Sequence, residues 1–437
     1  MAQSNPFKHS FVLFLFTALV IVIAITLAEN NTTDAENAID ADNATDAENV
    51  TDADNAAVAA VMPSAITDGM TCVANNLTNE ADTQRMEKLE KEQEYVDILN
   101  EAQNYWTAVV HENFALMDEE MLRNMVGSLE TPRYNANGSL ASQLHHNKTQ
   151  QQKKSATELP SKFDARKKWP ECADFIGMVT NQGYDGSKAC GSCWAISAAA
   201  VLTDRICIER LKKGIHSYTT NASLFVSTLD TLESQNCNCA PGYPNLAWKW
   251  FADTGVVTGT NYSMHLGCKP YIYPPESNLP KKPSGCRKQC DKQLPFNYRE
   301  GRVFKLKDAP THWSGMDENR EEEMMREIMT NGPIQISVNA YDDIYNYGES
   351  SNRINVYVHT VVKGTNSVYE NTKTIQNRMK LIGWGEESTD KGELVKYWNG
   401  VNSFGTDWGL NGLFKWRRGT DECRIESFDI NFGTPDV

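Results

Sequence analysis

The apolar run at residues 11–28 constrains this chain most, because it decides the compartment in which everything after it folds. The run, FVLFLFTALVIVIAITLA, follows Lys8 and His9 and ends in Thr-Leu-Ala just before Glu29. We interpret residues 1–28 as a secretory signal peptide; the alternative is a signal anchor, and only an uncleaved anchor would keep the chain on a membrane. In both cases we expect a secreted, lysosomal or other endomembrane protein with disulfides. Nine Asn-x-Ser/Thr sequons agree with this compartment.

Residues 29–79 form an acidic spacer that is rich in Asn, Asp and Ala. Within it, residues 33–56 consist of four similar hexads, TDAENA, IDADNA, TDAENV and TDADNA, which contain no aromatic side chain. Such a sequence cannot bury enough apolar surface to offset its conformational entropy, so we expect it to be disordered. The spacer contributes much of the net charge of −15 of the chain, and this acidity argues against nucleic acid as a partner.

Cys193 has the local sequence of a nucleophile. It lies in ACGSCWAIS (189–197) and begins an Ala-rich stretch free of Gly and Pro, which predicts a helix that starts at this residue. At a helix N-terminus the dipole favours the thiolate, which is the reactive form of cysteine. The alternative is a buried or disulfide-bonded cysteine without a chemical role.

Eight sequence blocks carry a family resemblance over residues 159–437. In order they are LPSKFDAR, NQGYDGSKACGSCWAISAAA, DRICI, GYPNLAW, NGPIQISV, LIGWG, VNSFGTDWG and CRIES. CGSCW is a fairly specific local signature, and the ordered series resembles the papain family of cysteine proteases, in particular its cathepsin B group. The resemblance implies an α+β, papain-like domain with two lobes, a helical left lobe and a β-barrel-like right lobe. Residues 80–158 resemble the cathepsin B propeptide and a linker, through VDILNEAQNYWTAVVHENF and MLRNMVGS, which implies a zymogen.

The resemblance assigns three catalytic roles: Cys193 is the nucleophile, Gln182 belongs to the oxyanion hole, and Asn402 orients a histidine. In the family that histidine stands six residues before the first glycine of the GWG block, and counting back from Gly383 leads to Asn377. An amide neither accepts a proton near neutral pH nor supplies the charge of a cysteine–histidine ion pair. We therefore expect a catalytically impaired or inactive homologue, a pseudoprotease that binds peptides. The alternative is an active endopeptidase that uses Cys193 with unusual base chemistry.

Two further departures concern the residues that support catalysis. The insertion YDGSKA separates Gln182 and Gly183 from Cys190, where the family has one residue, and it leaves the aim of Gln182 open. Phe404 stands where the family has a tryptophan that shields the neighbouring asparagine. With the histidine gone, we expect Asn402 to have nothing left to orient.

The resemblance also implies a substrate groove with Trp194, Gly242 and Glu426. Pro241 replaces the first glycine of a pair of which only Gly242 remains, and this restricts the backbone there. Glu426 matches the acidic floor of the family's S2 pocket, so we expect a groove for basic or apolar side chains; the alternative is an ordinary surface glutamate. Residues 268–286 lack the paired histidines that dock a substrate's C-terminus, so we expect no exopeptidase activity.

The eleven cysteines fit the same resemblance. It implies three disulfides and a looser fourth, namely Cys172–Cys207, Cys190–Cys239, Cys268–Cys290 and Cys237–Cys286, and it leaves Cys193 and Cys423 free. We expect no metal and no cofactor. The expected partners are a peptide or protein ligand in the cleft and the chain's own propeptide. A surface glycoprotein with an incidental protease-like fold is a further alternative.

Overall fold

The computed structural model describes residues 80–129, 158–215, 225–236, 238–280, 289–290, 304–362 and 376–437. The chain divides into two compact units, Met1–Asn75 and Asn76–Val437, and every described residue belongs to the second. The expected signal sequence, the acidic spacer and most of the expected linker lie outside the described residues. Within the described ranges, no helix is both long and apolar enough to span a bilayer.

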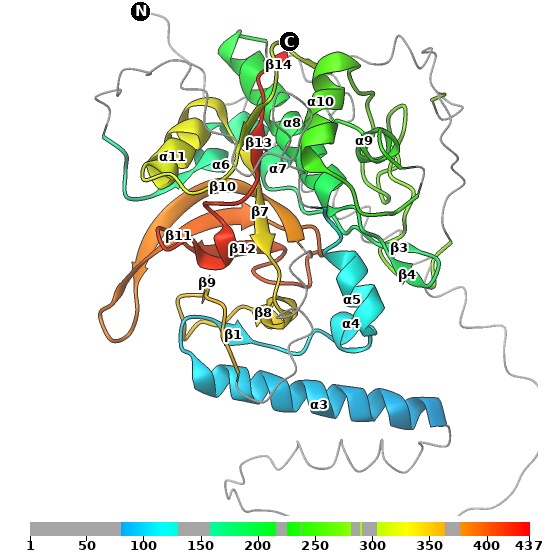
Figure 1. Ribbon diagram of the computed structural model, residues 1–437, viewed down its shortest axis with the longest axis vertical. Helices are drawn as coiled ribbons and strands as arrows, with labels where there is room; N and C mark the ends of the chain where they lie inside the picture. The colour runs from blue at the N-terminus through cyan, green and yellow to red at the C-terminus, as the bar shows by residue number, and fades with distance from the viewer. Residues whose placement is uncertain are drawn as a thin grey trace, which may run out of the picture. The chain divides into compact units, whose positions relative to one another are not determined.

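Short helices surround one long buried helix, α8 (Cys193–Lys212), and together they form the helical lobe (Figure 1). The Ala-rich sequence of α8 suits this central place, because Ala195, Ala198 and Ala199 are buried and let neighbouring helices approach closely. The hydrophobic core of the lobe is built around this helix. The other helices of the lobe are α6 (Ala165–Lys168), η1 (Pro170–Cys172), α7 (Ala173–Ile176), α9 (Thr228–Glu233) and α10 (Pro244–Asp253).

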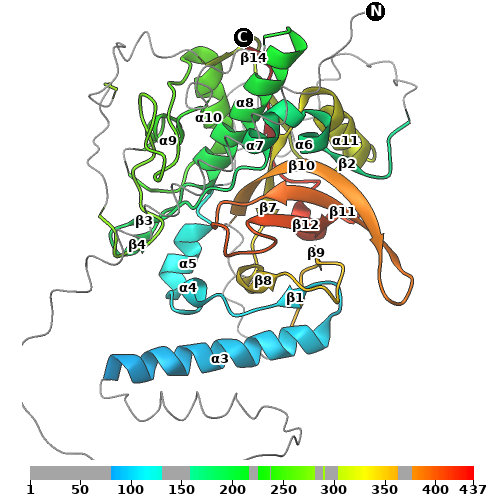
Figure 2. The same cartoon turned by 180° about the vertical axis from the view of Figure 1, so that it is seen from behind.

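An eight-stranded sheet forms the second lobe (Figures 1 and 2). Its strands neighbour one another in the order β6, β13, β7, β10, β11, β12, β9, and β2 pairs with β10 off this path. These pairs are antiparallel, apart from β12 with β9. The strands are β2 (Phe163–Asp164), β6 (Thr311–Trp313), β7 (Ile334–Asn339), β9 (Val356–Tyr357), β10 (Gln376–Ser388), β11 (Leu394–Val401), β12 (Leu413–Arg417) and β13 (Ile430–Phe432). The sheet has its own hydrophobic cluster, so the expected α+β architecture with two lobes is confirmed.

Smaller elements complete the described part of the chain. The helix α11 (Arg320–Asn331) packs against β7 and β10. Three two-stranded sheets and two short 3-10 helices connect the larger elements: β3 (Tyr184–Asp185) with β4 (Lys188–Ala189), β5 (Lys305–Leu306) with β14 (Pro435–Asp436), β1 (Thr107–Ala108) with β8 (Tyr347–Gly348), η3 (Asp342–Asn346) and η4 (Glu422–Arg424).

Residues 80–129, which we call the covering segment, pack along the sheet lobe on the side of β8 and β9 (Figures 1 and 2). The segment contains α3 (Glu80–Ala102), β1, α4 (Glu112–Ala115) and α5 (Glu119–Met125). Leu99 and Trp106 are fully buried and belong to the same hydrophobic cluster as the sheet. The pairing of β1 with β8 fixes the register, and Trp106 Nε1 donates to Val358 O at 3.0 Å. The covering segment is therefore folded into the core of the sheet lobe.

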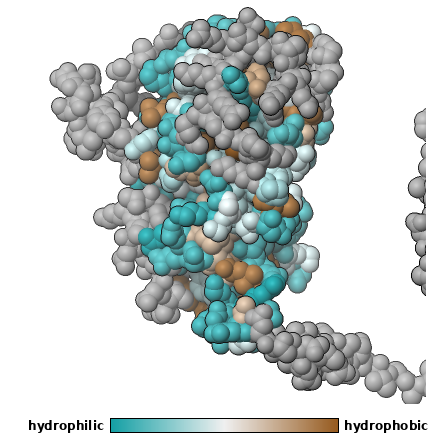
Figure 3. Space-filling view, turned by 90° about the vertical axis from the view of Figure 1, so that its right-hand side faces the viewer, coloured by the Kyte–Doolittle hydropathy of each residue, from teal (hydrophilic) through white to brown (hydrophobic). Residues whose placement is uncertain are grey.

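Within the covering segment, α3 contacts the sheet lobe through a narrow apolar stripe. Along the 23 residues of α3, only Val96 and Leu99 are buried. On the face in Figure 3, hydrophilic side chains dominate the coloured surface, and hydrophobic ones form small separate patches. The rest of the segment adds further buried apolar residues to the cluster of the sheet lobe, namely Trp106, Ala108, Phe114, Met117, Met125 and Val126.

The two lobes meet where α8 crosses β10, and a buried ion pair lies at this crossing. Lys380 Nζ of β10 is 2.7 Å from Asp204 Oδ2 of α8, and their side chains are 2% and 0% exposed. Lys380 Nζ also lies 3.4 Å from the carbonyl oxygen of Phe175. Burial raises the pKa of Asp204 to about 7, and the neighbouring Lys380 charge acts against that rise. The pair thus fixes the helix that carries Cys193 to the strand that carries Asn377.

We predict that Lys380→Met destabilises the protein by about 3–5 kcal/mol, because it leaves the Asp204 carboxyl group buried without its cation. The double variant Lys380→Met/Asp204→Leu should recover most of this loss, since an apolar pair has no charge to desolvate. Free energies of unfolding from urea titration of the full chain test the prediction. Equal stability of Lys380→Met and the parent would contradict the role given to the ion pair.

Candidate active site

Cys193 is the first residue of α8, where the sequence predicted a helix to start, and its side chain is fully buried. The hydroxyl of Ser192, which precedes the helix, lies 2.7 Å from Tyr271 Oη. Burial raises the pKa of the Cys193 thiol to about 11, against smaller lowering effects from a hydrogen bond of the Arg378 N–H and from the Arg378 charge. In this form the thiol is therefore neutral near neutral pH, although it lies at a helix N-terminus.

Asn377 immediately precedes Arg378 in β10, so it lies next to the peptide group that contacts the Cys193 sulfur. Its Nδ2 donates to Asn402 Oδ1 at 3.1 Å, and both side chains are buried. Asn402 thus has a side-chain partner in Asn377, and its Oδ1 also accepts from Ser403 N at 2.9 Å. That it has no histidine left to orient stays a prediction.

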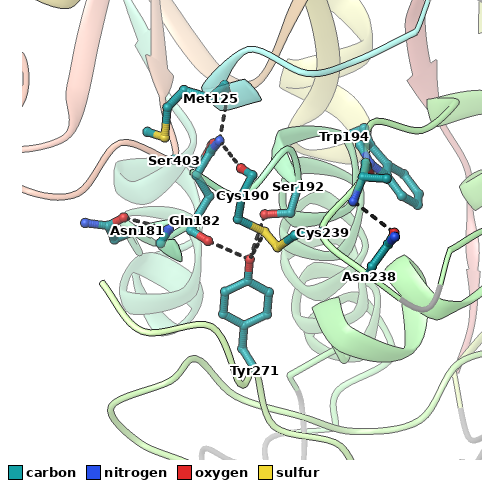
Figure 4. Close-up of a disulfide and its surroundings, with 12 residues drawn as sticks. Met125, Asn181, Gln182, Cys190, Ser192, Trp194, Asn238, Cys239, Tyr271 and Ser403 are labelled. Carbon is teal, nitrogen blue, oxygen red and sulfur yellow. Dashed lines mark hydrogen bonds between the residues drawn. A yellow bond between two sulfur atoms is a disulfide. The ribbon is translucent and has the colours of Figure 1, made fainter. Parts of the chain in front are cut away.

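Gln182 is held at the edge of the site by three hydrogen bonds (Figure 4). Its Nε2 donates to Cys190 O and to Met125 O, each at 2.6 Å, and its Oε1 accepts from Ser403 Oγ at 2.8 Å. Met125 belongs to the covering segment. The side-chain amide of Gln182 could donate to the carbonyl group of a bound ligand. In this structure it already donates to the carbonyl group of Met125, which belongs to the chain itself.

The insertion YDGSKA does not displace Gln182. It forms the hairpin of β3 and β4, and Cys190 N closes the base of this hairpin by donating to Gly183 O at 2.9 Å. Because the extra residues loop out, Gln182 stays in contact with Cys190. The hairpin also meets the covering segment through an exposed ion pair, with Lys188 Nζ 3.6 Å from Glu120 Oε1.

Residues 127–129 of the covering segment lie between the helical lobe and β10. Ser128 forms isolated β-bridges with Gly242 on one side and with Gln376 on the other. Leu129 N donates to Gly242 O at 3.1 Å, and Ser128 N donates to Gln376 O at 3.2 Å. The segment therefore occupies the cleft in the manner of a bound extended peptide.

Arg378 contributes to this cleft, and sequence reasoning missed it. Its Nη2 donates to Leu129 O at 3.2 Å and to Asp429 Oδ2 at 3.3 Å, and its side chain is fully buried. The sequence held one indication of this role, namely an arginine directly after Asn377 in a strand whose other residues are mostly buried. A charged side chain in such a strand requires a specific partner, which the sequence did not reveal.

Trp194 lies directly under Gly242, as the candidate groove residues would require. A Cβ atom added to Gly242 would lie 2.4 Å from the Trp194 ring, so only glycine allows this approach. Trp194 Nε1 points to Ala240 O at 3.4 Å. Gly242 thus packs against the Trp194 ring, while its backbone carbonyl accepts a hydrogen bond from the covering segment.

Glu426 does not form the floor of a ligand pocket, and this corrects the expectation from the resemblance. Its side chain is buried, and its oxygens accept from Trp398 Nε1 at 3.0 Å and from the backbone N–H groups of Gly419 and Asp421 at 2.6 and 2.7 Å. Burial raises the pKa of this carboxyl group, and these hydrogen bonds act against the rise. The carboxylate closes the loop before η4, so it is not an ordinary surface glutamate either.

Phe404 is buried and packs against the covering segment. Its ring centroid lies 5.5 Å from that of Phe114 of α4 and 5.5 Å from that of Trp408. Beside it, a cavity of about 1030 Å³ lies between the covering segment and residues 275–278. The cleft is therefore filled near Cys193 and hollow beyond Phe404.

Two histidines of the C-terminal region have partners away from Cys193. His359 Nδ1 lies 3.1 Å from Asp343 Oδ1, and its ring stacks on Tyr341. His312 Nδ1 lies 2.9 Å from Asn431 Oδ1. Neither of these contacts involves the Cys193 thiol.

The disulfides stabilise the helical lobe. The bonds Cys172–Cys207, Cys190–Cys239 and Cys268–Cys290 join the cysteines that the resemblance pairs, and Cys193 and Cys423 are free. The fourth expected pair, Cys237–Cys286, lies outside the described residues. In the described part of the chain, no group of three or more His, Cys, Asp or Glu side chains could hold a metal ion.

Comparisons with known proteins agree with this geometry. Residues 159–431 match the family described as papain family cysteine protease. The chain is 32% identical to Cathepsin B-like cysteine proteinase 6 of Caenorhabditis elegans, over 83% of this chain and 90% of the relative. It is also 32% identical to the Cathepsin B-like cysteine proteinase of Schistosoma japonicum, over 62% and 72%. The solved structure of proCathepsin B S9 from Trypanosoma congolense shares the fold, with 24% identity, a TM-score of 0.54 and coverage of 78% of this chain and 98% of its own.

We predict that alkylation of Cys193 in the intact chain accelerates about tenfold per pH unit between about pH 7 and pH 10. The reason is that a thiol whose pKa is raised to about 11 gains thiolate in proportion to hydroxide throughout this range. Iodoacetamide labelling, with the Cys193 peptide quantified by mass spectrometry, tests this. A rate that is already constant below about pH 7 would mean that the buried sulfur is a thiolate.

Proposed function

Because the chain belongs to the papain family of cysteine proteases and has cathepsin B-like relatives, we propose that it has lost peptide hydrolysis and acts by holding a peptide segment in its cleft. The observation that carries this proposal is the buried amide-to-amide hydrogen bond between Asn377 and Asn402 beside Cys193. This bond stands where an active enzyme of the family needs an imidazole.

We take Asn377 to occupy the position of the family's catalytic histidine. It lies six residues before Gly383, and its side chain donates to Asn402, the asparagine that the resemblance assigns to orienting that histidine. The next residue, Arg378, contacts the Cys193 sulfur through its backbone N–H. Sequence spacing and contacts therefore support the same alignment.

An amide at this position cannot perform the two proton transfers of acyl transfer. A histidine would take the thiol proton and later give it to the leaving amine, whereas the amide of Asn377 does neither near neutral pH. The charge of Arg378 lowers the pKa of the Cys193 thiol, but a guanidinium stays protonated and cannot act as a base. Its charge can favour a thiolate at Cys193 without completing the reaction.

The size of the expected loss in turnover decides whether the remaining activity is weak or negligible. Removing the base of a serine protease costs about a millionfold in turnover, although the oxyanion hole and substrate binding still give about a thousandfold over water. A thiol depends less on its base than a hydroxyl, so the loss here is expected to be smaller. It is nevertheless large enough to leave binding as the main function.

Peptide binding needs no imidazole, and the contacts to the covering segment support this part of the proposal. The backbone of Gly242, the amide of Gln182 and the guanidinium of Arg378 all bind main-chain atoms of that segment. We propose that the covering segment acts as a propeptide and that cleavage within residues 130–157 would let another peptide replace it. The expected setting is a secreted or lysosomal compartment.

We predict that the protein cleaved within residues 130–157 hydrolyses dipeptidyl and tripeptidyl fluorogenic substrates no faster than its Cys193→Ala variant. The reason is the missing proton acceptor at residue 377. Initial rates with and without a thiol inhibitor test this. A clear inhibitor-sensitive rate above that of the Cys193→Ala variant would establish an active endopeptidase instead.

Two variants of Asn377 provide the matched control for this assay. Asn377→His restores an imidazole and should raise alkylation of Cys193 at about pH 5–6, whereas Asn377→Gln keeps the amide and should not. Equal profiles for the two variants would show that residue 377 does not face the sulfur. The negative activity result would then need another cause.

A further inference from the structure

We propose that the cleft is selective for glycine in one slot, between Gly191 and Pro241, and that its ligands are therefore extended peptides with a glycine at this position. The inference rests on the proposed binding function and names the chemistry of the ligand. In the structure the slot holds Gly127 of the covering segment. Pro241 is the specificity-determining residue.

The slot leaves no room for a side chain. A Cβ atom added to Gly127 would lie 2.9 Å from Pro241 Cγ and 3.2 Å from Gly191 Cα. Ordinary contacts between carbon atoms are about 3.5–4.0 Å, so both separations are repulsive. The wall cannot move aside as a flexible side chain would, because the proline ring is fixed to its own backbone.

Hydrogen bonds and a disulfide fix Gly191, the floor of the slot, relative to Pro241, its wall. Gly191 N donates to Cys239 O at 2.9 Å, and the disulfide of Cys239 with Cys190 fixes the chain on both sides of this bond (Figure 4). A Cβ atom on Gly191 would itself lie 3.3 Å from Pro241 Cδ. Asn236 Nδ2 donates to Pro241 O at 3.1 Å, and this hydrogen bond helps to fix the position of Pro241. The slot is thus built into the domain and does not depend on the segment that fills it.

The residues after the glycine are bound mainly through their backbones. Gly242 O accepts from Leu129 N, and Arg378 Nη2 donates to Leu129 O. Main-chain contacts of this kind give affinity but little discrimination among side chains. The steric demand at residue 127 is therefore the strongest sequence requirement among these contacts.

The selectivity arises from a departure that the sequence already contained. The resemblance expects a glycine at residue 241, and a glycine would present no ring to the position of Gly127. Replacing it by proline narrows the slot on the side that faces the ligand. The same change that restricts the backbone at residue 241 therefore defines what the cleft accepts.

A double-variant experiment on the full chain tests this, with the rate of Cys193 alkylation as the measure of how often the cleft opens. Gly127→Ala should raise the rate about ten- to hundredfold, because overpacking a close contact displaces the segment. Pro241→Ala, which removes the Cγ and Cδ atoms of the wall, supplies the reference rate for the widened slot. Adding Gly127→Ala to Pro241→Ala should raise the rate by a clearly smaller factor than Gly127→Ala does in the parent, because the contact with Pro241 Cγ is gone while the contact with Asn124 O remains.

This combination separates the slot from a local effect within the covering segment. The added Cβ would also lie 2.8 Å from Asn124 O of the same segment, and that clash persists when Pro241 is changed. If Gly127→Ala raises the rate by the same factor in the Pro241→Ala chain as in the parent, or if Gly127→Ala has no effect in the parent, the inference is overturned. Circular dichroism and the melting temperature of each variant ensure that global unfolding is not being measured.

Peptides added to the Gly127→Ala chain test the ligand class. The synthetic peptide NMVGSLE (124–130) should protect Cys193 from alkylation at concentrations at least about tenfold lower than NMVASLE does. Equal protection by both peptides would overturn the glycine selectivity while leaving the binding function intact. Rescue by Pro241→Ala without protection by either peptide would support the slot and contradict the proposed function.

Discussion

The packing of α8 across β10 is the constraint on which the site depends. The helix brings Cys193 to the lobe boundary, and the strand brings Asn377 and Arg378 to the same place. The ion pair of Lys380 with Asp204 lies deeper in this crossing and is almost fully shielded from water, so its attraction is strong and its disruption costly. Disulfides then fix the surrounding loops of the helical lobe, including the loop that ends in Pro241 and Gly242.

The proposed function separates peptide binding from proton transfer. In that proposal, binding uses backbone groups and the amide of Gln182, which contact Met125, Ser128 and Leu129 of the covering segment. Proton transfer needs a titratable group beside Cys193, and Asn377 supplies none. The buried Asn402 Oδ1 accepts from Asn377 Nδ2 and from Ser403 N, so in the proposed alignment an amide at residue 377 leaves this oxygen satisfied.

Much of the fold could be predicted from the sequence, because the motifs that carry it are local. CGSCW with the Ala-rich stretch after it gives α8, and the spacing to the GWG block places Asn377 in β10. The failures concern contacts between distant residues. Glu426 was placed in a pocket because its neighbours in sequence match, but its partners Trp398 and Gly419 come from β11 and a turn. The sequence also left the aim of Gln182 open because of the insertion after Gly183, and the structure shows that a hairpin accommodates these residues.

The central claim is that Cys193, once uncovered, has no imidazole partner. The most direct measurement is the thiolate absorbance in the ultraviolet, recorded against pH for the protein freed of its covering segment, with the Cys193→Ala variant subtracted. The account predicts a single thiolate transition above about pH 8, like that of a cysteine without an ion-pair partner. A thiolate signal already present at about pH 5, and equally present in an Arg378→Gln variant, would contradict it, because a positively charged partner other than Arg378 would then hold the proton off the sulfur.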